Sequence, residues 1–182
     1  MKSFVKYLGS IMSISRIGII GAGQMGTGIA HVMALANYDV ILNDVLPEHL
    51  ISAKTTISQN LDRQISANKI SGDEASKAIS LVKTSVDLEA VANTDLIIEA
   101  VNEEEELKRK VFLSIMPYLG EDTVLTSNTS SISITRLASS TDRPEKFLGF
   151  HFMNPVPIMQ LVELIPGIAT TQNTFEKCAG VV

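Results

Sequence analysis

A chain of 182 residues is long enough for one well-buried domain and too short for two of ordinary size. Its residues are 45% hydrophobic but only 5% aromatic, which favours an α/β core of aliphatic side chains between a sheet and covering helices. A net charge of -5 and a pI near 5.2 argue against the polyanion-binding surface that nucleic acids select. Any anionic ligand must therefore be held locally, and we expect no nucleic-acid partner.

The beginning of the chain precedes any clear structural element, and we expect residues 1–15 to form a flexible N-terminal extension. This segment has neither a long apolar core nor an Ala-x-Ala cleavage site, which argues against a secretory signal. Apolar runs elsewhere are too short to cross a bilayer, so we expect no membrane partner. The one cysteine, Cys178, can form no internal disulfide. A cytoplasmic location is the simplest expectation.

Regular structure is predicted to begin with a strand, a glycine-rich turn and a helix. Residues 16–20 (RIGII) are a short apolar run, residues 21–26 (GAGQMG) form the turn, and a helix-forming stretch extends to Ala36. A second apolar strand over residues 39–43 (DVILN) ends at Asp44. The short gap between helix and strand is that of a right-handed crossover onto a parallel neighbour. These elements predict a complete βαβ unit.

The middle of the chain predicts a helical excursion from the sheet, over about residues 48–82. Ser71 is an N-cap candidate, and the acidic residues after it indicate that a new helix begins there. The chain then returns to a buried strand over residues 95–100 and continues in an amphipathic helix over residues 103–119. Leu107, Val111 and Ile115 form one apolar stripe of that helix.

The last part of the chain predicts a strand over residues 123–126, a short helix over residues 131–139, and two strands over residues 147–152 and 160–165. The fold class is therefore α/β: a Rossmann-like, doubly wound, mostly parallel sheet with a helical excursion after the second strand and an antiparallel edge hairpin. We expect one domain, over residues 16–182.

The glycine-rich turn predicts a dinucleotide site because it follows a strand, begins a helix and lies in a βαβ unit with an acidic residue after the second strand. Gly21 allows the tight turn, Gly23 lets the backbone approach a pyrophosphate, and Gly26 lets the helix lie close to the strand. The helix N-terminus favours the diphosphate. Asp44 is expected to accept hydrogen bonds from the ribose hydroxyls and to repel the extra phosphate of NADP, so NAD is preferred. The alternative is a structural turn that binds another nucleotide, or none.

A second candidate site lies near the C-terminal hairpin. If its two strands fold about Pro157, His151 and Glu163 are opposite each other, because each is six positions from that point. Opposed residues share a face, with Cβ atoms about 5 Å apart. A carboxylate there can orient the imidazole and raise its basicity, which is the arrangement of a general base. Alternatively, His151 is a satisfied core residue and Glu163 is simply solvated.

Five motifs together resemble the N-terminal domain of the 3-hydroxyacyl-CoA dehydrogenase family, including bacterial 3-hydroxybutyryl-CoA dehydrogenases. They cover nearly all of the chain from Arg16 onward, and the histidine within FHFMNPVP is far more specific than the glycine turn. The motifs are GAGQMG at 21–26, Asp44, EAVNE at 99–103, SNTSS at 127–131 and GFHFMNPVPIMQLVE at 149–163.

The resemblance implies reversible, NAD-dependent oxidation of an (S)-3-hydroxyacyl-CoA, such as 3-hydroxybutyryl-CoA, to the 3-ketoacyl-CoA in fatty acid or butanoate metabolism. It implies that His151 abstracts the hydroxyl proton, that Glu163 orients His151, and that Ser130 hydrogen-bonds substrate and cofactor. No metal is expected. The implied cofactor-binding residues are Gly21, Gly23, Gln24, Met25, Gly26, Asp44, Glu103, Lys108, Ser130 and Asn154.

Several of these residues have simpler alternatives. Ser130 precedes a helix and could cap it. Lys108 could pair with Glu104 one turn back. His31 and His49 are expected to be structural or exposed.

The resemblance also bears on what lies outside the chain. Members of the family carry a following all-helical domain that forms a homodimer interface and completes the acyl pocket, so we expect the 182 residues alone to be weakly active or inactive. Where relatives contact CoA, this chain offers Asn60, Asn68 and Lys69, and that contact cannot be transferred residue by residue. Two alternatives remain open: a β-hydroxyacid dehydrogenase that acts on a free acid, and a nucleotide-binding module with little activity.

Overall fold

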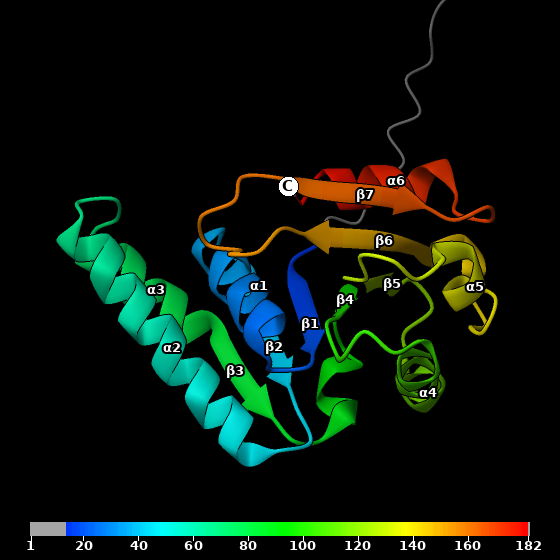
Figure 1. The fold of residues 1–182 in the computed structure, drawn as a ribbon, viewed down its shortest axis with the longest axis horizontal. Helices are drawn as coiled ribbons and strands as arrows, with labels where there is room; N and C mark the ends of the chain where they lie inside the picture. Colours follow the sequence, from blue (N-terminus) through cyan, green and yellow to red (C-terminus); the bar gives the residue numbers. More distant parts are fainter. Residues whose placement is uncertain (1–13, 182) are drawn as a thin grey trace, which may run out of the picture.

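The computed structural model describes residues 14–181, so most of the expected N-terminal extension lies outside the described residues. The described part forms a seven-stranded sheet in the order β3-β2-β1-β4-β5-β6-β7, with helices on both faces (Figure 1). The strands are β1 (Arg16–Ile20), β2 (Asp39–Asn43), β3 (Val82–Ser85), β4 (Leu96–Glu99), β5 (Val124–Ser127), β6 (Phe147–Phe152) and β7 (Val162–Pro166). The helices are α1 (Gln24–Leu35), α2 (Pro47–Ser66), α3 (Gly72–Leu81), α4 (Glu105–Ile115), α5 (Ile134–Ala138) and α6 (Gln172–Ala179), with 3-10 turns η1 (Leu88–Val91), η2 (Met116–Tyr118) and η3 (Pro144–Lys146).

The sheet confirms the predicted Rossmann-like topology. The strands from β3 to β6 are parallel to their neighbours, and only β7 runs antiparallel, beside β6. The strand order reverses between β1 and β4. At such a reversal the connections leave to opposite faces, which opens a crevice outside the carboxyl ends of the strands. The fold therefore places a binding crevice after β1 and β4.

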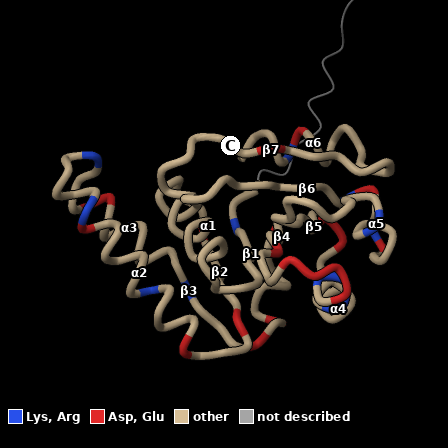
Figure 2. Tube along the Cα trace, viewed as in Figure 1, with Lys and Arg blue, Asp and Glu red and all other residues tan. Residues whose placement is uncertain are grey.

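Two apolar cores hold the sheet between its helices. Successive strand residues point to opposite faces, so Ile19 and Ile98 pack with α1, α2, α3 and α6, whereas Ile20 and Ile97 pack with α4, α5 and η1. All four of these side chains are buried. The charged residues in Figure 2 lie mostly on helices and loops rather than on the strands. Burial on both faces explains why the strands appear in the sequence as continuous apolar runs.

The helical excursion predicted over about residues 48–82 is confirmed, but it ends in a strand that was not predicted. The structure has α2 and α3, and the capping box of α3 is complete, because the Ser71 hydroxyl accepts the Glu74 N–H while the Glu74 carboxylate accepts the Ser71 N–H. The sequence analysis missed β3, which continues directly from α3 and pairs with β2. This strand has only four residues, and only Val82 among them is buried, so it produces no apolar run.

Other boundaries differ by a few residues. The helix predicted over 103–119 is α4 over Glu105–Ile115, and Pro117 lies in the 3-10 turn that follows it. The helix predicted over 131–139 is the shorter α5, capped by Ser133. The last predicted strand begins at Val162 instead of 160. Helix α6 was not predicted, and the Cys178 thiol is buried within it.

Candidate active site

The glycine-rich turn between β1 and α1 has the backbone that the sequence predicts. Gly21 has a φ of +105°, in the left-handed region that favours glycine. A Cβ on Gly26 would lie 1.8 Å from the carbonyl oxygen of Gly21, so only glycine allows α1 to approach this closely. A Cβ on Gly23 would have no atom within 4 Å. Gly23 is the N-cap of α1 and therefore leaves an open backbone surface before the helix N-terminus.

Asp44 follows β2 directly and lies beside this turn. Its Oδ2 accepts the N–H of Ala22 at 2.8 Å, and its Oδ1 accepts the N–H of Leu46 at 3.0 Å. Partial burial opposes ionisation of the carboxyl group. The hydrogen bonds from Ala22, Leu46 and His49 outweigh that effect and hold the pKa of Asp44 below its ordinary value. The carboxylate is therefore an ionised acceptor, fixed at the carboxyl edge of the sheet.

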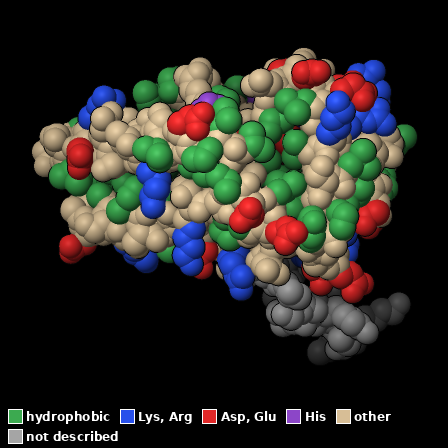
Figure 3. Space-filling model, turned by 90° about the horizontal axis from the view of Figure 1, so that it is seen from below, with side chains coloured by type: hydrophobic (Ala, Val, Ile, Leu, Met, Phe, Trp, Pro, Cys, Tyr) green, Lys and Arg blue, Asp and Glu red, His purple; other side chains and the backbone are tan. Residues whose placement is uncertain are grey.

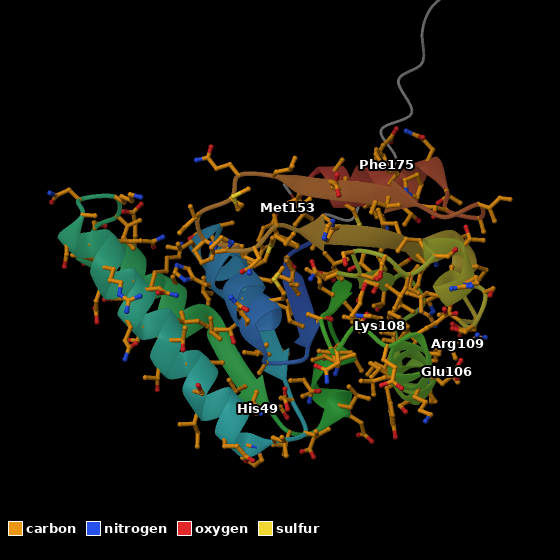
Figure 4. The ribbon with its side chains drawn as sticks, viewed as in Figure 1. His49, Glu106, Lys108, Arg109, Met153 and Phe175 are labelled. Atoms are coloured by element: carbon orange, nitrogen blue, oxygen red, sulfur yellow. The ribbon has the colours of Figure 1, made fainter. Side chains whose placement is uncertain are left out.

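His49 is a site residue that the sequence analysis left as structural or exposed. It lies near the start of α2, and its Nδ1 is 3.1 Å from Oδ1 of Asp44 (Figure 4). Its side chain is half exposed. Only its position five residues after Asp44, where the first turn of a helix returns to the strand end, could have indicated this contact. His31, by contrast, is buried within α1, as a structural residue would be.

Two cavities meet along the carboxyl edge of the sheet. The first, named here the β2-side cavity, has a volume of about 470 Å³ and the second, the β6-side cavity, about 370 Å³. Gly23, Ala100, Val101 and Asn102 line both. Figure 3 views the molecule from below, the side toward which β2 and β3 point in Figure 1, and shows hydrophobic side chains exposed among acidic ones. The two cavities form one continuous track across the glycine turn.

The β2-side cavity has apolar walls on two sides of Asp44. Ile20, Val86 and Val101 contribute from the sheet side, and Leu107 and Val111 contribute from α4. Such walls suit a planar, mostly apolar group, and Asp44 supplies a polar acceptor beside it.

The apolar stripe predicted for α4 is confirmed at Ile115 and differs at its other two positions. The buried residues of α4 are Lys108, Phe112 and Ile115, whereas Leu107 and Val111 line the β2-side cavity. The apolar pattern alone cannot reveal this shift, because a lysine occupies a core position. Two glutamates make that position possible.

The buried lysine lies in an ion-pair network. Lys108 Nζ is 2.8 Å from Glu99 Oε1 and 3.3 Å from Glu103 Oε2, and it donates to the carbonyl oxygen of Val101 at 3.2 Å. The ammonium pairs with these two glutamates and not with Glu104, the expected alternative partner. Burial raises the pKa of Glu99, and the Lys108 ammonium and the Ser127 hydroxyl oppose that increase.

Glu103 joins this network to the SNTSS loop. Its Oε1 accepts hydrogen bonds from the Thr129 hydroxyl at 2.5 Å, from the Ser130 N–H at 3.0 Å and from the Ser131 hydroxyl at 3.0 Å. Partial burial raises the pKa of Glu103, but the Thr129 hydroxyl, the Lys108 charge and the serine donors together lower it to about 2. Glu103 is thus an ionised clamp on Ser130.

Ser130 lines the β6-side cavity and does not cap the following helix. The N-cap of α5 is Ser133, so the alternative capping role is wrong. Asn128, which the sequence analysis did not single out, also lines this cavity, and its Oδ1 accepts the N–H of Phe152 at 2.8 Å. That bond ties the loop after β5 to the end of β6, where the histidine lies. The position of Asn128 within the SNTSS motif was the sequence feature that could have indicated its place in the site.

His151 and Glu163 are opposite each other in the β6–β7 pair, as predicted. His151 Nδ1 lies 2.9 Å from Glu163 Oε2. The chain leaves β6 at Phe152 and returns only at Val162, so the connection is a long loop, but the register remains symmetric about Pro157. His151 lines the β6-side cavity. With Nδ1 held by the carboxylate, Nε2 is the ring nitrogen that can take a proton.

Asn154 and Gln24 meet across the cavity wall. The Gln24 Nε2 donates to Oδ1 of Asn154 at 3.2 Å, and both residues line the β6-side cavity together with Met25. The same two residues line a third cavity of about 500 Å³, which we name the α2 cavity. The α2 cavity lies between the glycine turn, the loop after β6 and one face of α2, which contributes Ser52, Thr56 and Asn60. Asn68 and Lys69 are not among its lining residues.

Two features are absent from residues 14–181. No helix in that range is long and apolar enough to cross a membrane. In the same range, no group of three or more His, Cys, Asp or Glu side chains is placed to hold a metal ion.

Comparison with known proteins identifies the family. The sequence model of a family described as 3-hydroxyacyl-CoA dehydrogenase, NAD binding domain, matches residues 16–182. The chain belongs to the 3-hydroxyacyl-CoA dehydrogenase family. It is the NAD-binding domain of that family, and NAD is its cofactor.

Relatives and solved structures agree with this assignment to the 3-hydroxyacyl-CoA dehydrogenase family. The chain is 53% identical over 163 residues to a 3-hydroxybutyryl-CoA dehydrogenase of Bradyrhizobium diazoefficiens, covering 90% of this chain and 56% of that protein. It is 40% identical to the mitochondrial hydroxyacyl-coenzyme A dehydrogenase of Mus musculus, covering 90% of this chain and 54% of that protein. A solved (S)-3-hydroxybutyryl-CoA dehydrogenase from Ralstonia eutropha superposes with a TM-score of 0.90 at 39% identity, covering 93% of this chain and 60% of that chain. The chain spans about half the length of these relatives.

Proposed function

We propose that this chain carries the cofactor site and catalytic base of an enzyme that reversibly oxidises (S)-3-hydroxyacyl-CoA, such as 3-hydroxybutyryl-CoA, to 3-ketoacyl-CoA in fatty acid or butanoate metabolism. The observation that carries the proposal is the His151–Glu163 pair, because its histidine lines the cavity that continues from the glycine turn. The names of the relatives in the 3-hydroxyacyl-CoA dehydrogenase family support the same reaction.

The residues of the track fit a bound NAD. The open backbone at Gly23 and the N-terminus of α1 suit its diphosphate. The β2-side cavity suits the adenosine, because Asp44 offers carboxylate lone pairs that its three protein donors do not fill. We assign the nicotinamide to the β6-side cavity, beside Ser130 and Asn154. When bound there, NAD supplies the hydride acceptor of the reaction.

In this proposal His151 is the general base. Glu163 holds Nδ1 and stabilises the protonated ring, so Nε2 takes the proton of the substrate hydroxyl. Ser130 lies in the same cavity, and its hydroxyl, which donates to Glu103 at a long 3.4 Å, can turn to donate its hydrogen to the oxygen that becomes the ketone. These residues place the base and the donor around one reacting carbon, and orientation of this kind lowers the barrier.

The α2 cavity is the proposed acyl-CoA site. It shares Gly23, Gln24 and Asn154 with the β6-side cavity, so a long ligand within it reaches the place assigned to the nicotinamide. Its volume of about 500 Å³ and its polar residues on α2 fit a pantetheine chain better than a small free acid. Asn60 is the candidate contact on α2.

The test uses the full gene product with acetoacetyl-CoA and NADH. We expect NADH oxidation that is lost in His151→Ala, while NAD binding measured by calorimetry is retained. Absence of NADH oxidation in the native protein, or full turnover in His151→Ala, would refute the proposal. A second comparison uses 3-hydroxybutyrate as a free acid. Faster turnover of the free acid than of the CoA thioester would favour the alternative β-hydroxyacid dehydrogenase.

Assembly and location complete the proposal. Large apolar side chains are exposed on the loop before β7 and on the segment after it, and they include Ile158, Leu161 and Ile168. An exposed apolar surface of this kind is suited to packing against the all-helical domain of the family. Through that domain the full protein would form a homodimer. Cys178 is a buried free thiol, which suits a cytoplasmic protein. Size-exclusion chromatography with light scattering on the full gene product tests the dimer, and a monomer would refute it.

A further inference from the structure

Two oppositely charged side chains are buried beneath the cofactor track. Glu99, at the end of β4, is 0% exposed, and Lys108 on α4 is 1% exposed. Neither residue lines the β2-side, β6-side or α2 cavity. Figure 4 shows Lys108 on the side of α4 that is turned toward the sheet. Any effect of this pair on a ligand must therefore act through other residues.

The ammonium of Lys108 faces acceptors within the protein. Its Nζ donates to Glu99 Oε1 at 2.8 Å and to the Val101 carbonyl at 3.2 Å, and it lies 3.3 Å from Glu103 Oε2 in an ion pair. Only 1% of the Lys108 side chain is exposed. The family resemblance places Lys108 among the residues around NAD, and in this structure its ammonium holds Val101 and Glu103, which line the β6-side cavity.

Both members of the pair hold the same peptide segment. The Val101 N–H donates to Glu99 Oε1 at 2.7 Å, and the Val101 carbonyl accepts from Lys108. Val101 lines both cavities of the track, as do its neighbours Ala100 and Asn102. Hydrogen bonds to Glu99 and Lys108, which carry opposite charges, thus fix the segment from 100 to 102.

We propose that the buried Glu99–Lys108 pair positions the floor of the NAD site, by fixing the backbone of Val101 and the carboxylate of Glu103. The inference rests on the proposed function for the location of the cofactor. Glu103 lines the β6-side cavity and clamps Ser130, so the pair acts on the nicotinamide side through Glu103 and on the adenosine side through Val101. Glu99 and Lys108 are positioning residues.

Stability alone does not account for a buried pair at this place. Well-packed apolar residues of similar size often replace buried ion pairs without loss of stability, because burying two charges is costly. What an apolar pair cannot provide is a donor for the Val101 carbonyl and a charge for Glu103. A variant without the charges can therefore keep the fold and lose the binding geometry.

The test measures NAD affinity by calorimetry and the melting temperature without NAD, both on the 182-residue chain. The decisive variant is the double substitution Glu99→Gln with Lys108→Met, which removes both charges and nearly keeps side-chain length. We expect it to melt within a few degrees of the native chain and to bind NAD at least roughly tenfold more weakly, the size of a lost charged hydrogen bond. Native affinity in the folded double variant would overturn the proposal.

A milder variant tests the positioning role if the double variant does not fold. Ser127→Ala removes only the hydroxyl that donates to Glu99 Oε2 at 2.6 Å. We expect the chain to stay folded with a melting temperature a few degrees lower, and an NAD affinity roughly two- to fivefold weaker, and unchanged affinity would overturn the proposal. Arg136→Met is the matched control, because it breaks an exposed 2.6 Å pair with Glu105 and is expected to change neither quantity.

The result is independent of the proposed reaction. If the native chain binds NAD but the full gene product does not oxidise NADH with acetoacetyl-CoA, the proposed function fails while the positioning role can still be measured. If turnover is present and the double variant binds NAD like the native chain, only the positioning role fails.

Discussion

His151 on β6 and Glu163 on β7 stand directly opposite each other in an antiparallel pair, and their side chains meet at 2.9 Å. Because the two residues come from adjacent strands, the sheet itself fixes their separation. Glu163 is about half exposed while His151 is mostly covered, so the carboxylate approaches the ring from the solvent side. The pair therefore combines a base fixed by the sheet with a carboxyl partner at its Nδ1.

The first prediction concerns this pair. In Glu163→Gln an amide replaces the carboxylate, so the ring nitrogen keeps a neighbour but the protonated ring loses its charge partner. We expect kcat with acetoacetyl-CoA and NADH to fall, by less than the roughly 10²- to 10⁴-fold loss expected for His151→Ala. Calorimetric NAD affinity should stay unchanged in both variants. Turnover within about twofold of the native value in Glu163→Gln would remove the carboxylate from the mechanism.

The second prediction separates two glycines of the same turn. Gly23→Ala should fold normally, because the new Cβ meets no atom within 4 Å, but it places a methyl group where the diphosphate approaches. Gly26→Ala should lose stability as well, because its Cβ would lie 1.8 Å from the Gly21 carbonyl. Thermal melting and NAD calorimetry on both variants check this. Equal melting temperatures for the two variants would contradict the assigned roles.

A feature of the fold or of the site could be predicted where residues close together in the sequence determine it. The turn glycines, the Ser71–Glu74 capping box and the His151–Glu163 register all follow from spacing along the chain. Spacing was sufficient to predict the β6–β7 register, because paired residues in an antiparallel pair lie at equal distances along the chain from the midpoint of the connection, whatever its conformation.

Features that depend on tertiary neighbours could not be predicted. Strand β3 exists because β2 has an open edge, although its own four residues show no strand pattern. Lys108 occupies a core position only because Glu99, from another element, is buried beside it. The role of His49 was not predicted because its position five residues after Asp44 is the only local signal that the start of α2 turns it toward Asp44.

The third prediction concerns cofactor choice. Asp44→Ser removes the negative charge that opposes a 2′-phosphate, so the ratio of NAD to NADP affinity should fall by roughly tenfold or more. His49→Leu keeps that charge and removes one partner of Asp44, so NAD binding should weaken slightly while the preference for NAD remains. Calorimetry with both cofactors on the two variants is the measurement. A native NAD preference in Asp44→Ser would show that another residue discriminates.

The fourth prediction is the pH dependence of stability at Glu103. Its pKa falls from the ordinary value of 4.5 to about 2 in the folded chain. The folded state therefore binds fewer protons than the unfolded state between these values, and the free energy of unfolding decreases as pH falls through this window. Above about pH 4.5 the stabilising contribution of the ionised carboxylate is fully present, and near pH 2 it is largely lost.

Glu103→Gln isolates this contribution, because the other carboxylates titrate alike in both proteins. We expect the native chain to be more stable than the variant at pH 6 in urea unfolding, and the difference between them to shrink steadily from about pH 4.5 toward pH 2. A constant difference across that range would mean that the clamp on Thr129, Ser130 and Ser131 does not depend on the charge of Glu103. Since the same charge faces Lys108, the ammonium would then be held by Glu99 and the Val101 carbonyl.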